Sequence, residues 1–236
     1  MDPNHRRLFS YRAAMRFLRR VHAEFLLVIP RLTRTRLGMT LLVLGTTLVW
    51  LSARGFDALT VTLQAGALGA ILGAAAIVGD ESDRAALTTA LTHSTTPLAI
   101  ATGRWLAIVI PASALVMVCA ASIGWRANAV VAGVIATAAV GSCALAVVLP
   151  LGRGAALALF LFMAVAGTIA PERLVDLARP GVVRLTAASA MELGPALWHY
   201  REIARGDVGA TVHALAWIGL GILLASASIR RCRLAL

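Results

Sequence analysis

Six long apolar stretches constrain the fold of this chain more than any other feature of its sequence. A helix needs about 20 mostly apolar residues to cross a membrane, because the hydrocarbon core is about 30 Å thick and each residue rises about 1.5 Å. The stretches approach this length, and short polar segments separate them. We therefore predict an all-α integral membrane protein with six transmembrane helices. The predicted spans are Leu37–Ala53, Ala58–Gly79, Ala101–Gly124, Ala127–Leu151, Gly154–Ala170 and Val208–Ser228.

The composition agrees with a membrane environment and excludes several other functions. Hydrophobic residues make up 59% of the chain and charged residues 14%, and the mean hydropathy is +0.83. A net charge of +11 would suit nucleic acid, but the Arg residues lie between apolar runs, so we predict no nucleic-acid partner. The chain contains no Lys and therefore no phosphate-binding loop of the G-x-x-x-x-G-K-[ST] type. The three cysteines lack metal or redox spacing, so we predict packed thiols and no metal site.

Residues 1–36 are predicted to form an amphipathic helix at the cytoplasmic membrane surface, and residues 37–236 one membrane domain. Arg side chains interrupt the apolar residues of this first segment, so we expect that it is not the core of a signal peptide and is retained. Pro30 is predicted to end the helix. The apolar positions that recur at helical spacing are Tyr11, Met15, Leu18, Val21 or His22, Phe25 and Ile29.

The distribution of Arg residues predicts the orientation. An even number of spans puts both termini on one side, and cytoplasmic termini place most of the 22 basic residues inside. We therefore expect a multi-pass protein of the cell (plasma or inner) membrane with both termini cytoplasmic. Gly152 and Arg153 alone join the fourth and fifth spans, which predicts a tight hairpin. Residues 171–207 are predicted to form short helices at the outer interface.

Few polar groups lie inside the predicted spans. Gly66, Gly69 and Gly73 are spaced for close helix packing, which favours contacts within the chain over a subunit contact. Gln64 either lines a substrate path or makes an interhelical hydrogen bond, and the second role is favoured. His213, near the start of the last span, is interpreted as structural.

The segment after the second span carries the strongest functional pattern. Asp80, Glu81 and Asp83 stand where a short helix begins, and acids there favour the helix dipole. Leu87 and Leu91 then share one apolar face, because residues four apart are neighbours on a helix. The pattern predicts a short helix on the cytoplasmic surface between spans two and three, suited to docking against a soluble partner.

This arrangement resembles the membrane subunits of ABC type-2 exporters. In that family a Glu after the second span, a Leu-rich coupling helix and a Gly-Arg or Gly-Lys pair opening the third span recur. The chain departs from the family pattern at Arg84, where a Gly-Thr pair commonly follows the Glu, and at Pro97, which comes later than the family's Pro. The matching positions here are Glu81, Leu87, Leu91, Gly103 and Arg104.

The resemblance implies a permease subunit with no catalysis of its own. A separate ATP-binding subunit would bind ATP and Mg, and a second permease copy or a related permease would complete the membrane pathway. Glu81 is the leading residue, because its charge would pair with Arg84 or with an Arg of the N-terminal helix and hold the coupling geometry. The expected ATPase-coupling residues are Asp80, Glu81, Asp83, Arg84, Leu87, Leu91, Gly103 and Arg104.

Two alternatives belong to other classes of protein. An intramembrane protease would need a Ser nucleophile in a Gly-x-Ser context or a His-Glu-x-x-His zinc motif, and the sequence holds neither. A non-transporting membrane scaffold or sensor would use the same basic termini to contact lipid or a partner, and it stays open as the alternative function.

Overall fold

The fold was analysed in a computed structural model, which describes residues 3–34, 57–77, 96–124, 126–164, 166–170 and 181–234 and the single positions 40, 43, 45–47, 50, 54 and 173. None of these residues lies in a strand. The helices are α1 (Pro3–Arg34), α3 (Ala58–Ile77), α5 (Pro97–Ile123), α6 (Ala127–Leu151), α7 (Arg153–Ala164), η1 (Ala166–Thr168), α9 (Val182–Leu193), α10 (Leu197–Tyr200), η3 (Arg201–Arg205) and α11 (Val208–Leu234).

Four of these helices are long and apolar enough to cross a membrane. They cover Ala58–Ile77, Pro97–Ser122, Ala127–Leu151 and Val208–Arg231, which confirms long apolar helices at the second, third, fourth and sixth predicted spans. Their length and composition indicate a helical membrane protein. The predicted first span, Leu37–Ala53, lies largely outside the described residues.

The predicted fifth span differs from the observed helix. α7 ends at Ala164 and has 12 residues, which at about 1.5 Å per residue reach only about 18 Å. A 3-10 turn at Ala166–Thr168 follows in place of a continued helix. A membrane-spanning helix over Gly154–Ala170 is therefore not confirmed. A tight turn is observed at the predicted place, because Gly152 alone separates α6 from α7 and has a φ of 79° that suits glycine.

Small side chains let the long helices approach closely. α6 lies between α3 and α11, and α5 packs along α3 and α1. A Cβ added at Gly66 of α3 would collide with the Thr137 side chain of α6, and one at Gly133 would lie 2.7 Å from Cγ1 of Val116 on α5. The expected intramolecular packing of Gly66 is thus confirmed.

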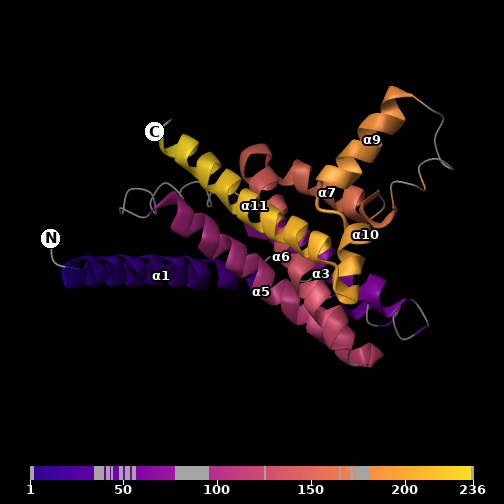
Figure 1. The fold of residues 1–236 in the computed structure, drawn as a ribbon, viewed down its shortest axis with the longest axis horizontal. Helices are drawn as coiled ribbons and strands as arrows, with labels where there is room; N and C mark the ends of the chain where they lie inside the picture. Colours follow the sequence, from indigo (N-terminus) through magenta and orange to yellow (C-terminus); the bar gives the residue numbers. More distant parts are fainter. Residues whose placement is uncertain are drawn as a thin grey trace.

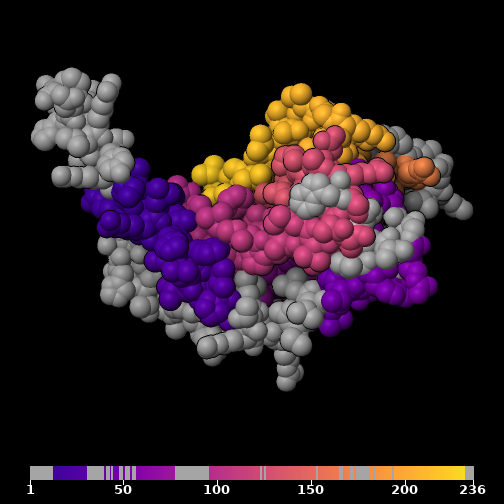
Figure 2. All heavy atoms as spheres, turned by 90° about the horizontal axis from the view of Figure 1, so that it is seen from below, coloured from indigo at the N-terminus to yellow at the C-terminus, as the bar shows by residue number. Residues whose placement is uncertain are grey.

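The N-terminal helix is partly inserted into this bundle. Val21 and Val28 are buried, and Phe25 packs against the core. Met15, nearer the N-terminus, is exposed, and Figure 1 shows that part of α1 projecting beyond the other helices. In the space-filling view of Figure 2, the indigo surface of α1 lies against the magenta surface of α5.

The prediction that Pro30 ends this helix is wrong. α1 continues through Pro30 to Arg34, so the loss of one backbone N–H donor does not stop it. Val28, 1% exposed, and the half-buried Ile29 pack against the core just before the proline and hold the helical path there. Tertiary packing therefore outweighs the local preference of proline.

The bundle has two distinguishable ends. We call the end with the start of α5 and the last turns of α11 the terminal end, because both chain termini also lie toward it in Figure 1. The opposite end holds the start of α3, the turn between α5 and α6, and η3. The predicted short helices of residues 171–207 are observed as α9, α10 and η3, and α9 extends away from the bundle.

The contact between α6 and α11 gives the first prediction. A Cβ added at Gly221 would lie 2.6 Å from the backbone carbon of Ser142, whereas one at Gly219 would meet nothing within 4 Å. Gly221→Ala should therefore destabilise the protein by about 1–3 kcal/mol through overpacking. Gly219→Ala should stabilise it by about 0.5–1 kcal/mol, because alanine loses less backbone entropy on folding than glycine.

Thermal unfolding of both variants in detergent, followed by intrinsic fluorescence, measures the two effects. Shifts in the melting temperature of the same sign and size would show that α6 and α11 do not approach at Gly221.

Candidate functional site

The sequence around the start of α5 fixes where Gly103 and Arg104 lie. Thr96 caps the helix, since its side-chain oxygen accepts a hydrogen bond from the backbone N–H of Ala99 at 3.3 Å. Pro97 occupies the first turn, where a missing N–H costs little. Gly103 and Arg104 therefore stand in the second turn, near the terminal end of the bundle.

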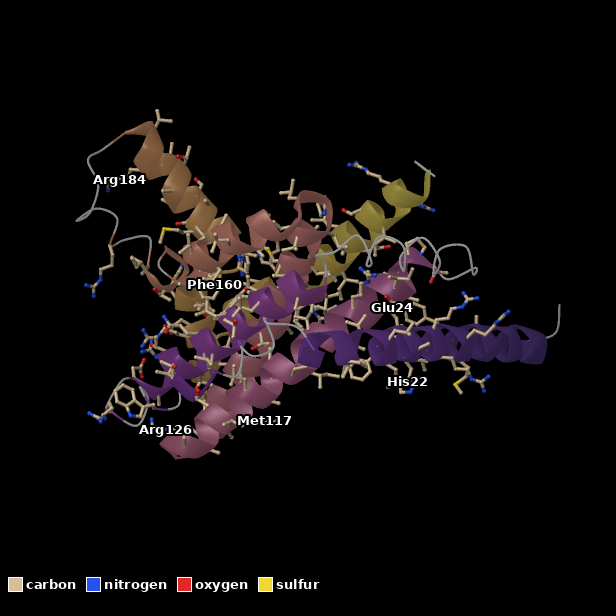
Figure 3. All side chains as sticks on the ribbon, turned by 180° about the vertical axis from the view of Figure 1, so that it is seen from behind. His22, Glu24, Met117, Arg126, Phe160 and Arg184 are labelled. Carbon is tan, nitrogen blue, oxygen red and sulfur yellow. The ribbon has the colours of Figure 1, made fainter. Side chains whose placement is uncertain are left out.

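A buried ion pair joins this turn to the N-terminal helix. Nε of Arg104 donates to Oε1 of Glu24 at 3.0 Å, and the two side chains are 2% and 9% exposed. Figure 3 shows Glu24 on the side of α1 that faces the bundle. Two buried charges stabilise each other only as a pair, and removing one typically costs about 3–5 kcal/mol. The pair therefore fixes the position of α1 on α5.

Gly103 makes this pairing geometrically accessible. A Cβ at this position would lie 2.7 Å from Cβ of Glu24 and 2.9 Å from the backbone oxygen of Val21. Real side chains do not approach so closely, so any larger residue would push α1 away from α5. The glycine brings the two helices together, and Arg104 then reaches Glu24 without leaving the protein interior.

The other expected coupling residues lie within residues 78–95. The structure does not describe residues 78–95, and the expected pairing of Glu81 with Arg84 or with an Arg of α1 stays a prediction. The residues concerned are Asp80, Glu81, Asp83, Arg84, Leu87 and Leu91.

Gln64 lies half-buried on α3. Its side-chain amide makes no hydrogen bond within the described part of the chain, so the favoured interhelical hydrogen bond is not observed there. Its role on a substrate path stays a prediction.

Sequence reasoning missed Glu24, although the sequence carries a signal for it. Glu24 is the only acidic residue between Asp2 and Asp57, and it stands among Arg side chains. It also falls three residues after Val21 and four before Val28, which puts it on the buried stripe of the helix. An acid on the apolar face of a basic helix indicates a buried cationic partner.

His213 belongs to an aromatic cluster on α10 and α11. Its ring packs edge-on against His199, with centroids 5.2 Å apart, and lies 5.8 Å from the ring of Tyr200. Burial raises the pKa of Tyr200, so its hydroxyl stays neutral. These contacts pack α10 onto α11, which agrees with the structural interpretation of His213.

No protein-family model matches the chain, and no match was found among curated proteins.

The buried pair gives the second prediction. Glu24→Leu should destabilise the protein by about 3–5 kcal/mol, because the buried guanidinium of Arg104 would lose this carboxylate partner. Combining it with Arg104→Met should recover much of that loss, since two apolar side chains remove the desolvation cost. Unfolding of the single and double variants in detergent measures the coupling between the two sites.

Glu202→Gln is the matched control, because Glu202 is 36% exposed and pairs with Arg205 on the surface. Its effect should stay within about 1 kcal/mol. If the losses of stability caused by Glu24→Leu and Arg104→Met simply add in the double variant, a direct interaction between Glu24 and Arg104 is contradicted.

Proposed function

We propose that this chain is the permease subunit of an ATP-powered exporter of the ABC type-2 kind, working with a separate nucleotide-binding ATPase subunit. The observation that carries the proposal is the buried Glu24–Arg104 pair. It ties the amphipathic N-terminal helix to the start of α5, directly after the segment expected to couple the chain to its partner. A displacement of that segment would therefore move α1 and α5 together.

The placement of charges supports a cytoplasmic terminal end. Arg16 and Arg19 are exposed on the projecting part of α1, and Arg230 and Arg231 are exposed in the last turns of α11. Cationic side chains at one end of a bundle favour the cytoplasmic side and anionic lipid headgroups. We therefore propose that both termini lie in the cytoplasm of a cell-membrane protein and that α1 rests at the lipid interface.

The proposed division of labour gives this chain no catalytic role. The partner subunit would bind ATP and Mg, and residues 80–91 would dock on it through the acids and through Leu87 and Leu91. A second copy of this chain or a related permease would form the other half of the pathway. Gln64, half-buried on α3, is the polar side chain proposed for that pathway.

Affinity purification from the native membrane in mild detergent tests the proposal and gives the third prediction. A nucleotide-binding subunit should co-purify in stoichiometric amount, and the eluate should hydrolyse ATP. Glu81→Gln should lower this hydrolysis several-fold, because the charge that holds the coupling geometry is lost, and membrane insertion should not change.

Glu192→Gln serves as the control, since Glu192 is exposed on α9, outside the expected coupling segment. Unchanged hydrolysis in Glu81→Gln would remove Glu81 from the mechanism. Reproducible absence of any ATPase would favour the membrane scaffold or sensor instead.

A further inference from the structure

A cleft of about 430 Å³ opens at the opposite end of the bundle. It lies between the start of α3, the turn from α5 to α6, and η3, so three separate parts of the chain form its walls. A volume of this order accommodates a small ligand or part of a larger one. The lining residues used below are Asp57, Leu59, Ala120, Arg126, Ala127 and Asn128.

The negative charge in this cleft is already neutralised. Nη2 of Arg201 donates to Oδ2 of Asp57 at 2.7 Å, and the hydroxyl of Thr60 donates to the same oxygen at 2.6 Å. The hydrogen bond from Thr60 and then the charge of Arg201 lower the pKa of Asp57, against the opposing effect of burial. The carboxylate of Asp57 is therefore ionised at neutral pH, and it already forms an ion pair with Arg201.

The positive charge of Arg126 has no such partner among the described residues. Arg126 is exposed at the start of α6, lines the cleft, and makes no ion pair with any residue that the structure describes. Figure 3 places it at the end of the bundle away from Glu24. Since Asp57 is paired with Arg201, Arg126 carries the uncompensated charge among the described lining residues. The amide of Asn128 adds hydrogen-bond donors beside it.

Part of the lining of the cleft is apolar. Ala120 is 4% exposed, and Leu59 packs against the hydrophobic core. A positive side chain and apolar side chains in one cleft complement a molecule that carries a negative group on a short apolar body. A cationic ligand would be repelled by Arg126, and a purely apolar one would leave the guanidinium unpaired.

We propose that this cleft binds an anionic amphiphile, with a phosphate group on Arg126 and Asn128 and the apolar part on Leu59 and Ala120. Two sources carry this chemistry, a phospholipid headgroup and a free phosphate compound. Binding at this cleft needs no ATPase subunit. A failure to bind the ligand would therefore not contradict the proposed transport function, and a failure of the transport proposal would not contradict ligand binding.

The test uses the full-length chain, purified in dodecyl maltoside, a neutral detergent. Radiolabelled dodecyl phosphate is the probe, and its binding is measured on immobilised protein. The wild-type chain should bind it saturably. Arg126→Gln should weaken binding by about tenfold or more, because a charge-assisted hydrogen bond is lost.

A second variant keeps the test independent of any loss of folding. Ala127 is exposed in the first turn of α6, where an acidic side chain favours the helix dipole. Ala127→Glu should therefore preserve or raise stability while weakening probe binding by a similar factor. Arg230→Gln removes an exposed charge at the terminal end and should change binding by less than about twofold.

Competition then separates the two sources. If inorganic phosphate displaces the probe as effectively as unlabelled dodecyl phosphate does, the result supports the cleft as a site for a free phosphate compound. If only unlabelled dodecyl phosphate displaces the probe, the result supports the cleft as a site for a lipid-like ligand. The proposal is overturned if the wild-type chain does not bind the probe, or if Arg126→Gln and Ala127→Glu bind it as tightly as the wild type.

Discussion

The ion pair between Glu24 and Arg104 fixes the position of the N-terminal helix on the bundle, because it joins α1 to α5 through two side chains that are only 9% and 2% exposed. Removing one member of a buried pair typically costs about 3–5 kcal/mol. Apolar packing alone would let a basic amphipathic helix slide along a lipid surface, whereas a buried pair has one geometry. Gly103 permits that geometry and defines the depth at which α1 sits against α5.

The remaining helix contacts rely on close approach, since apolar side chains gain little by leaving lipid for another helix. Trp105 of α5 donates its Nε1–H to the backbone oxygen of Ala138 on α6 at 3.0 Å. Ser142 of α6 bonds the backbone oxygen of Trp217 on α11 at 2.9 Å, beside Gly221. Each contact joins a different pair of helices, so α6 links the bundle through small residues and backbone carbonyls.

The sequence predicted what depends on local composition and missed what depends on distant partners. Apolar length located four long helices, and Gly152 located the turn between α6 and α7. The continuation of α1 through Pro30 comes from the packing of Val28 and Ile29, which local sequence preference does not encode. Glu24 pairs with a residue 80 positions away, so only the fold reveals its partner. The cleft likewise forms where three separate segments of the chain meet, so only the fold reveals it.

The two ends of the bundle are held by ion pairs of different strength, and this difference bears on the proposed mechanism. The pair of Asp57 and Arg201 at the opposite end has side chains 52% and 46% exposed, and such pairs are worth about 0–1 kcal/mol. The buried pair at the terminal end is far costlier to break. The proposed permease would open one end while force enters at the other. The weak pair lies where η3 meets α3, so under the proposed mechanism those segments would separate while α1 and α5 move as one body.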